Sequence, residues 1–315
     1  MSKKIKVHLL VNETAGNGNA KKANIALQQV LNELNIPFTW QKSRFPKELT
    51  TLAKNYANTN PSENNILIVV GGDGSFNEVL NGIKASNYPD TPITYLPAGT
   101  GNDFARGAGL TADPRQLVHN LLNDLAPEQV DCGYFSANIP GENTGYFVNN
   151  FGIGFDAFIV YQSNHEKLKD MLNRLNLGNL IYGLNVVKAL AQQDTFTVTV
   201  KTKHKTWRYS NAYFVTTTNH PYFGGGFAIL PKADFYSHHL DTVIVEKPSL
   251  SKFIFLFSKL LKDGSHVNAP QFHYVEAQEI QVETRKPEFA QIDGEDVNTQ
   301  GFKVKFKIDH FNLLK

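Results

Sequence analysis

The chain has 315 residues, 41% hydrophobic and 19% charged, so it is long enough for two domains that each bury a core. Its net charge of +2 creates no strong field, so charge alone indicates neither a nucleic acid nor an acidic substrate. Cys132 is the single cysteine, which excludes an internal disulfide or a thiolate metal cluster and suits a reducing cytosol.

The first third of the chain alternates predicted strands with predicted helices. The strands are expected at 5–11, 38–41, 66–70 and 93–96, and the helices at about 23–34, 47–56 and 76–83. The order β-α-β-α-β-α-β predicts a parallel sheet with crossover helices and a site at the carboxyl ends of the strands. The first residues alternate charged and apolar side chains too early for a secretion signal, so we expect a cytoplasmic protein.

A glycine turn follows the buried strand 66–70 and reads Gly71-Gly72-Asp73-Gly74-Ser75. Three glycines allow positive φ and let a ligand approach bare amides at the N-terminus of a helix, which suits phosphate. Asp73 is an anion beside this anion site, so it either shares a divalent cation with the phosphates or handles a proton. The alternative, a tight turn with a solvated aspartate, explains one or two glycines better than three.

A second glycine turn, P-A-G-T-G-N-D-F, occupies 97–104 after the strand 93–96. Together the two turns resemble the catalytic domain of the diacylglycerol kinase family, in particular its soluble bacterial lipid kinases; the family also includes sphingosine and ceramide kinases. That family has a G-G-D-G-T/S signature followed by a glutamate, and a P-x-G-T-x-N-D-F segment about one βα unit later. The resemblance extends over nearly the whole chain.

The resemblance implies a Mg-ATP-dependent phosphotransferase that acts on a lipid hydroxyl, with diacylglycerol as the default substrate and phosphatidic acid as the product. Asp73 would contact the metal, Glu295 would be the catalytic base, and Asp131 would orient the site. The loop 12–16 resembles the family's N-P-x-x-G loop, with Glu13 in place of the proline. The resemblance assigns to the nucleotide Asn12, Thr14, Gly16, Ser43, Gly71, Gly72, Gly74, Ser75, Glu78, Thr100 and Asn102.

The character of the chain changes after a helix that begins at Asp113-Pro114, a cap residue followed by a proline at the first helical position. From there on short runs alternate apolar and polar residues, at 196–200, 212–215, 243–245, 280–282 and 303–308. This period of two predicts an antiparallel β-sandwich, interrupted by a helix near 250–261. We therefore expect an α/β nucleotide-binding domain at 1–131 and a β-sandwich lipid-substrate domain at 132–315.

Two further segments of the second half resemble the family. The stretch 146–156 resembles its strand followed by G-x-G-F-D, and D-G-E at 293–295 resembles the turn that ends its second domain. Without that resemblance D-G-E is an ordinary hairpin turn. With it, Glu295 faces the nucleotide domain across the cleft, which makes this residue the candidate base.

No apolar run reaches the ~20 residues that are needed to span a bilayer. The expected location is therefore the inner membrane surface, with ATP and a membrane lipid as partners and a homodimer left open. The stretches 168–191 and 253–257 are the candidate surface for lipid approach, although both also fit core helices. Charged substitutions at Ile181 or Leu184 are expected to reduce activity on vesicles more than on dispersed substrate.

One loop departs from the family pattern. Bacterial members hold a structural magnesium in a loop that includes D-D-G, whereas Tyr236, Ser237 and His238 occupy those positions here. Because a hard divalent cation needs carboxylate or carbonyl oxygens, we expect this structural site to be empty or filled by water. Asp103 would then hydrogen-bond Ser237 or a water molecule.

Two alternative functions, from other classes of protein, remain open. A phosphofructokinase-like or NAD kinase-like enzyme shares the turn 71–74, but the segments 99–104 and 152–156 favour a lipid kinase. A non-catalytic lipid-binding protein could keep the same fold, but Asp73 and Glu295 are both present and speak against it.

Overall fold

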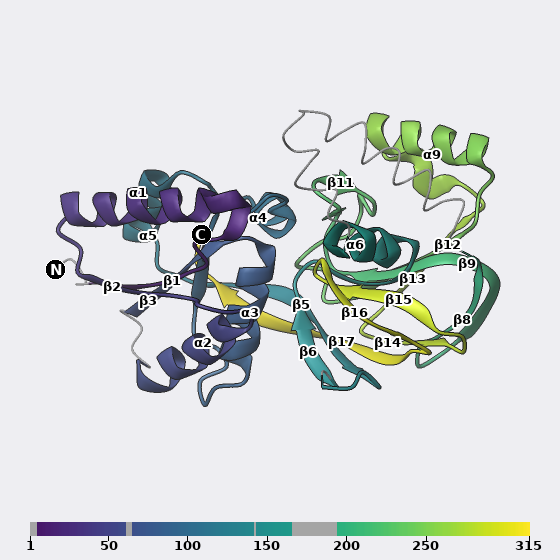
Figure 1. The fold of residues 1–315 in the computed structure, drawn as a ribbon, viewed down its shortest axis with the longest axis horizontal. Helices are drawn as coiled ribbons and strands as arrows, with labels where there is room; N and C mark the ends of the chain where they lie inside the picture. Colours follow the sequence, from purple (N-terminus) through teal and green to yellow (C-terminus); the bar gives the residue numbers. More distant parts are fainter. Residues whose placement is uncertain (1–4, 61–64, 142, 166–193) are drawn as a thin grey trace.

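The computed structural model describes residues 5–60, 65–141, 143–165 and 194–315. These residues form an α/β half and a half rich in β-strands, drawn side by side in Figure 1. The α/β half contains β1 (Lys6–Val11), the short 3-10 helix η1 (Ala15–Gly18), α1 (Asn19–Glu33), β2 (Phe38–Lys42), α2 (Glu48–Thr59), β3 (Asn65–Gly71), α3 (Asp73–Lys84), β4 (Ile93–Pro97), α4 (Asp103–Ala108) and α5 (Pro114–Asn123).

The predicted parallel sheet is confirmed, in the order β4-β3-β1-β2. Val7 of β1 lies opposite Phe38 on one side and Ile66 on the other, and all of these pairings are parallel. Each strand therefore ends at the same edge of the sheet. The loops that follow Val11, Lys42, Gly71 and Pro97 all emerge there.

Alternate side chains of β3 enter two different cores. Ile66, Ile68 and Val70 pack with residues of α1 and α5, whereas Leu67 and Val69 pack with residues of α2 and α3. The strand is hydrophobic throughout because both of its faces are covered, as is usual for a parallel sheet. Figure 1 shows α1 and α5 on one side of the sheet and α2 and α3 on the other.

The second half consists mainly of antiparallel strands, as predicted. Its elements are β5 (Glu128–Ala137), β6 (Thr144–Phe147), β7 (Asn150–Gly154), α6 (Phe155–His165), β8 (Phe196–Lys201), β9 (Thr206–Thr218), β10 (Tyr222–Phe223), β11 (Phe227–Ala228), β12 (Leu240–Glu246), α9 (Leu250–Lys262), the 3-10 helix η2 (Ser265–Asn268), β13 (Phe272–Ala277), β14 (Glu279–Thr284), β15 (Glu288–Ile292), β16 (Glu295–Gln300) and β17 (Lys303–Leu313). The order β16-β15-β7-β9-β8-β14-β17 continues into β4, with β12 and β13 paired beside β9.

The strand β17 joins the two halves. Val304 and Phe306 lie in the core of the β-rich half, whereas Phe311 and Leu313 lie in the core beneath α2 and α3. Leu313 also pairs in parallel with Ile93 of β4, so the last strand extends the α/β sheet. Figure 1 shows the end of the chain within the α/β half, and the predicted division between 131 and 132 falls inside β5.

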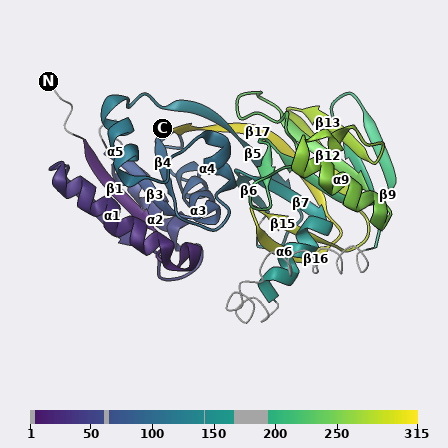
Figure 2. The same cartoon turned by 90° about the horizontal axis from the view of Figure 1, so that it is seen from above.

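Two stretches that the sequence singled out in the second half can now be located. The segment 146–156 ends β6, forms β7 and opens α6, whose first turn contains Asp156. The predicted helix 250–261 is confirmed as α9, which lies over β12 and β13 in Figure 2. The stretch 168–191, with Ile181 and Leu184, lies entirely outside the described residues.

Candidate active site

Two cavities meet at the edge where the parallel strands end. The polar cavity, of about 830 Å³, is lined by the loops after β1, β2, β3 and β4. The apolar cavity, of about 560 Å³, extends from the start of α3 and α4 into the β-rich half. Thr100, Asp293 and Glu295 line both cavities, so the two spaces share one wall.

The polar cavity brings together most of the residues that the sequence assigns to the nucleotide. Its lining includes Asn12, Thr14, Gly16, Ser43, Gly72, Gly74, Ser75, Glu78 and Thr100, together with Glu295. The two remaining nucleotide assignments, Asn102 and Gly71, and the metal assignment, Asp73, lie elsewhere. Asn102 and Asp73 line the apolar cavity, and Gly71 is buried at the end of β3, where its carbonyl oxygen accepts a hydrogen bond from the backbone amide of Ala98.

Side chains tie the glycine loops of the polar cavity to one another. The Asn12 amide nitrogen donates to Ser75 Oγ over 3.1 Å, and Thr14 Oγ1 donates to Asn12 Oδ1 over 2.8 Å. Gly16 has a φ of +59°, and a Cβ there would lie 2.1 Å from the carbonyl oxygen of Ala98. Glycine is therefore required at this position by both conformation and space. The loops after β1 and β4 are packed backbone against backbone.

Two cations of the polar cavity were not assigned from the sequence. Arg44 and Lys47, in the loop after β2, are the basic side chains among the lining residues that are described. The guanidinium of Arg44 pairs with Glu48. Lys47 lies near enough to Glu295 and Glu78 to lower the pKa of both carboxyls, against a larger increase from burial. The sequence signal that could have identified Arg44 and Lys47 is that both follow a strand of the parallel sheet.

Asp73 begins α3 at the junction of the two halves. Its Oδ2 accepts a hydrogen bond from the backbone amide of Asp103 over 2.7 Å, and Tyr95 Oη lies 3.5 Å from Oδ1. Burial, together with a smaller contribution from the charge of Asp103, raises the pKa of Asp73 from 3.8 to about 6. A carboxylate that is held partly desolvated in this way gains from a bound cation.

The expected hydrogen bond between Asp103 and Ser237 is not found. Asp103 Oδ2 accepts from the backbone amide of Gly225 over 2.9 Å, and Oδ1 lies 3.2 Å from an Arg106 nitrogen. Ser237 Oγ instead lies 3.4 Å from the carbonyl oxygen of His239. Asp103 thus binds the turn between β10 and β11. A sequence pattern could not predict this contact, because the donor is a backbone amide.

The D-G-E turn between β15 and β16 gives its two acids different surroundings. The Asp293 carboxylate accepts hydrogen bonds from the backbone amides of Val148, Asn149 and Asn150 and from the side chain of Asn77, at 2.7 to 2.9 Å. It therefore links α3 to the β-rich half. The sequence analysis assigned no role to Asp293, although its position in the D-G-E turn next to Glu295 was a signal.

Glu295 follows directly and lines both cavities. Its Oε1 lies 3.8 Å from the position of a Cβ on Gly74, at the first turn of α3. Partial burial raises the pKa of Glu295 above its usual range, and the charge of Asp296 adds to the increase. A carboxyl group with a raised pKa beside a helix N-terminus has the chemistry of a proton acceptor.

Two other predicted site residues have partners of their own. The Glu78 carboxylate accepts from the backbone amides of Lys47 and Leu49, at 3.1 and 3.2 Å, so it also holds the start of α2. Asp131 lines neither cavity. Its carboxylate is buried and accepts from the backbone amide of His238 over 2.7 Å, so an orienting role would act through the loop 231–241.

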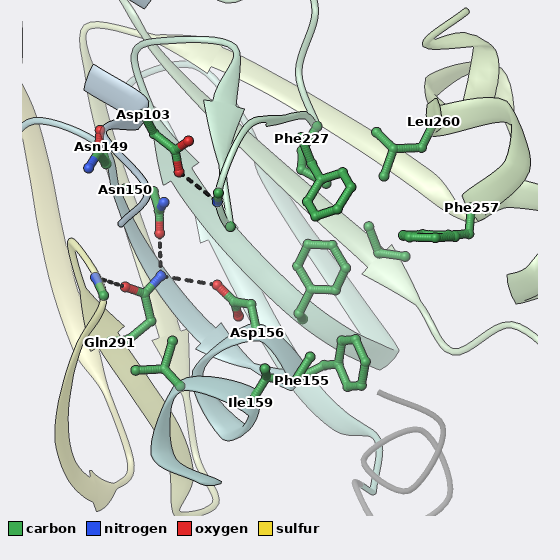
Figure 3. Close-up of a pocket in the computed structure, with 18 of the residues that line it drawn as sticks. Asp103, Asn149, Asn150, Phe155, Asp156, Ile159, Phe227, Phe257, Leu260 and Gln291 are labelled. Atoms are coloured by element: carbon green, nitrogen blue, oxygen red, sulfur yellow. Dashed lines mark hydrogen bonds between the residues drawn. The ribbon is translucent and has the colours of Figure 1, made fainter. Parts of the chain in front are cut away.

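The apolar cavity is lined by side chains from distant parts of the chain. Phe155 and Ile159 come from α6, Tyr213 from β9, Phe227 from β11, and Leu260 from α9. Figure 3 shows the aromatic and aliphatic side chains at one end and Asp103, Asn149 and Asn150 at the other.

A polar cluster lies between these ends. Gln291 Nε2 donates to Asn150 Oδ1 and to Asp156 Oδ2, as drawn in Figure 3. Thr216 Oγ1 donates to the same oxygen of Asp156 over 3.1 Å. Burial raises the pKa of Asp156. The cavity therefore has one polar end near Asp73 and a long apolar remainder, which suits an amphipathic ligand.

The described residues contain no group of three or more His, Cys, Asp or Glu side chains that could hold a metal ion. The prediction for the loop 231–241 stays a prediction. Mg²⁺ is commonly held by one or two carboxylates together with substrate phosphates, and Asp73, beside the glycine turn, fits that donor set. Within the same described part of the chain, none of the helices has the length and apolar character to cross a bilayer.

Comparisons with known proteins agree with this geometry. Residues 6–134 match the diacylglycerol kinase catalytic domain, and residues 152–314 match the YegS C-terminal NAD kinase beta sandwich-like domain. A Bacillus subtilis protein named "Putative lipid kinase YtlR" is 28% identical over 94% of this chain and 94% of its own length. A "Diacylglycerol kinase" of the same organism is 26% identical over 92% of this chain and 89% of its own length.

A solved structure supports the fold assignment. The crystal structure of a "putative diacylglycerol kinase" from Bacillus anthracis str. Sterne superposes with a TM-score of 0.77 at 22% identity. The superposition covers 100% of this chain and 96% of the other. At this identity the similarity shows a shared fold.

Proposed function

We propose that this chain, which belongs to the diacylglycerol kinase catalytic-domain family of lipid kinases, transfers the γ-phosphoryl group of Mg-ATP to the hydroxyl of a membrane lipid. Diacylglycerol is the proposed acceptor and phosphatidic acid the product. We further propose that the enzyme works at the inner surface of the cytoplasmic membrane.

The shared wall of the two cavities is the observation that supports this proposal. A polar cavity lined by glycine turns suits a nucleotide, and an apolar cavity with one polar end suits a lipid. Thr100, Asp293 and Glu295 line both, so the γ-phosphate and the hydroxyl can meet there. A protein that only binds one ligand does not need two cavities that share a wall.

Each part of the junction has a role in phosphoryl transfer, which depends mainly on positioning and on charge neutralisation. The backbone amides at 72–75 and 12–16 hold the phosphates. Thr100 contacts the nucleotide where the cavities meet. Glu295 accepts the proton of the lipid hydroxyl as its oxygen attacks the γ-phosphorus, and ADP leaves with the electrons of the broken bond.

Asp73 is the proposed ligand for the magnesium ion that enters with ATP. Magnesium supplies charge neutralisation on the phosphates when it is bound. Asp73 Oδ2 is already hydrogen-bonded to the amide of Asp103, which fixes the orientation of the carboxylate before any ligand arrives. The raised pKa of Asp73 favours cation binding because a cation relieves the cost of the buried charge.

A phosphotransfer assay with a panel of acceptors tests the proposal. Purified protein is incubated with γ-labelled ATP, magnesium and, separately, diacylglycerol, phosphatidylglycerol, a sphingoid base, an undecaprenol-type alcohol, NAD and a sugar phosphate. We expect label in phosphatidic acid. Label in NAD or in the sugar phosphate alone would favour a small-molecule kinase, and no label in any acceptor would favour a lipid-binding protein.

A further inference from the structure

We propose that α9 docks this protein onto an anionic lipid bilayer, with Leu250, Ile254 and Leu261 inserted among the acyl chains and Lys252 and Lys259 level with the lipid phosphates. The inference deepens the proposed function and rests on it for the choice of lipid as the partner. Its test measures binding and does not require catalysis.

The outward side of α9 is unusually apolar. Leu250, Ile254 and Leu261 are 52%, 60% and 60% exposed, and their spacing of four and seven residues places them on one strip of the helix. Of the fourteen large apolar side chains that are exposed in the described part of the chain, five belong to this one helix. Apolar side chains gathered in this way mark a contact surface.

The adjoining side of the same helix forms a wall of the apolar cavity. Phe253, Leu256, Phe257 and Leu260 line that cavity at the spacing of one helical face. Phe257 belongs to both surfaces, since it lines the cavity and is also 37% exposed. Figure 3 shows Phe257 and Leu260 pointing from α9 toward Phe227 and the cavity. A lipid in contact with the strip thus lies next to the helix face that lines the proposed acceptor site.

The charges of α9 favour an anionic bilayer. The helix contains Lys252, Lys259 and Lys262 and no Asp or Glu. Lys252 Nζ and Lys259 Nζ lie 5.4 and 5.0 Å from the ring centroid of Phe255, so both ammonium groups lie beside an exposed aromatic side chain of the same helix. Interfacial helices combine inserted apolar residues with such lysines, which bind the phosphates of anionic lipids.

A second copy of the chain is a poorer occupant. In a symmetric dimer the same patch meets itself, so each α9 would bring three lysines and no carboxylate to a helix of the same charge. Like charges at short range oppose that contact. An anionic bilayer surface, in contrast, attracts the lysines of α9.

Vesicle co-sedimentation of the full-length protein tests the docking strip. Ile254→Glu combined with Leu261→Glu is compared with Ile25→Glu combined with Leu122→Glu, which changes two side chains that are similarly exposed on α1 and α5. We expect the α9 variant to lose affinity for phosphatidylglycerol-containing vesicles by on the order of tenfold, and the control to keep wild-type affinity. Equal affinity of both variants would overturn the proposal.

A charge-reversal variant tests the lysines separately. Lys252→Glu combined with Lys259→Glu is expected to abolish the preference for phosphatidylglycerol vesicles over phosphatidylcholine vesicles, together with the salt dependence of binding. A preference that survives the reversal would contradict the proposed role of these lysines.

A fluorescent reporter keeps the test informative if the acidic variants fold poorly. Ile254→Trp is expected to shift its emission to shorter wavelength and to be quenched by brominated phosphatidylglycerol vesicles. Ile25→Trp on α1 is the matched control and is expected to do neither. Trp40 and Trp207, common to both proteins, give the same background in each. Indistinguishable responses of the two reporters would exclude insertion of α9.

Two readouts separate this inference from the proposed function. Vesicle binding that depends on the strip but occurs without phosphotransfer would support docking and contradict the kinase. Lipid phosphorylation together with vesicle binding that does not depend on the strip would support the kinase and contradict docking through α9. A wild-type dimer in light scattering that the Ile254→Glu, Leu261→Glu variant converts to a monomer would identify a second copy as the occupant and overturn the proposal.

Discussion

The polar cavity and the apolar cavity share a wall but are built in opposite ways. The polar cavity is lined mainly by loops that each follow a strand of one parallel sheet, so segments of a few consecutive residues supply much of its lining. Residues of β5 and β6 and the segment 292–297 complete it. The apolar cavity takes one or a few side chains from each of many elements, among them α6, β9, β12 and α9. Local chain geometry therefore determines the first cavity, and tertiary packing determines the second.

This difference predicts how each cavity responds to substitution. In the polar cavity the backbone is the binding surface, so a change of conformation at one glycine should be costly. In the apolar cavity many side chains share one function, so single substitutions should have smaller effects that depend on the ligand. The shared wall should be the exception, since a few acids act there on both ligands.

Among substitutions outside the shared wall, the largest effect is expected from Asp73→Asn. Turnover should fall on the order of 10³-fold, because a charged group that stabilises the reacting phosphates is removed. The magnesium dependence of ATP binding should weaken as well. Titration of ATP affinity against magnesium measures this, with Asp90→Asn, at an exposed aspartate that lines neither cavity, as the matched control. An unchanged magnesium dependence would exclude Asp73 as a ligand.

The same variant should be more stable than the wild type at neutral pH. The folded-state pKa of Asp73, about 6, lies above the ordinary 3.8, so the charged form costs folding free energy once the pH exceeds about 4. Removing the charge should raise the free energy of unfolding by about 1 kcal/mol at neutral pH, with little change at acid pH. Denaturant unfolding at both pH values measures this gain.

Gly16→Val is expected to have the second largest effect. A side chain at this position meets the carbonyl oxygen of Ala98 and opposes the positive φ, so the loop after β1 must move. ATP affinity should fall on the order of 10²-fold, as for a misplacement of about 1 Å at a binding group. Lipid binding should be unchanged, and a parallel loss of both would show that the two cavities are not independent.

Leu260→Asp probes the apolar cavity and should have a smaller effect. A carboxylate in an apolar wall disfavours a hydrocarbon neighbour, so the KM for long-chain diacylglycerol should rise about tenfold. A short-chain diacylglycerol, which fills less of the cavity, is the internal control. Equal increases for the two substrates would place the acyl chains elsewhere.

The smallest expected effect is a change in the pH dependence of stability. His220 is fully buried, donates through Nε2 to Asn149 Oδ1, and has its pKa lowered by burial to about 3. The unfolded chain therefore binds a proton below about pH 6.5 that the folded chain refuses, and stability falls as the pH falls. His220→Asn should reduce this slope by about 1 kcal/mol per pH unit below pH 6. An unchanged slope would show that His220 is not the cause.

The comparison of the two cavities also explains how much the sequence could predict. The strands, the crossover helices and the glycine turns follow from short patterns, because β3 alternates between two covered faces and Asp113 caps α5 through its own side chain. The loops at the strand ends came together as expected, because parallel strands end at one edge. These features depend on neighbours in the sequence.

The features that the sequence did not predict depend on distant contacts. Asp103 binds the backbone of Gly225 rather than Ser237, and a backbone amide has no residue-type signature. The Asp293 carboxylate accepts hydrogen bonds from backbone amides at the start of β7. The last strand, β17, enters the α/β core, which no local pattern indicates. The apolar cavity likewise has no motif, since its side chains also fit an ordinary core.

The most direct test of the account is Glu295→Gln, measured for ATP affinity, lipid affinity and turnover on the same preparation. Glu295 lines both cavities and is the proposed proton acceptor where they meet. We predict that both affinities stay within about twofold of wild type while turnover falls by ~10²–10⁴, as for removal of a general base. Wild-type turnover in this variant would contradict the central claim that the two cavities serve one reaction at this residue.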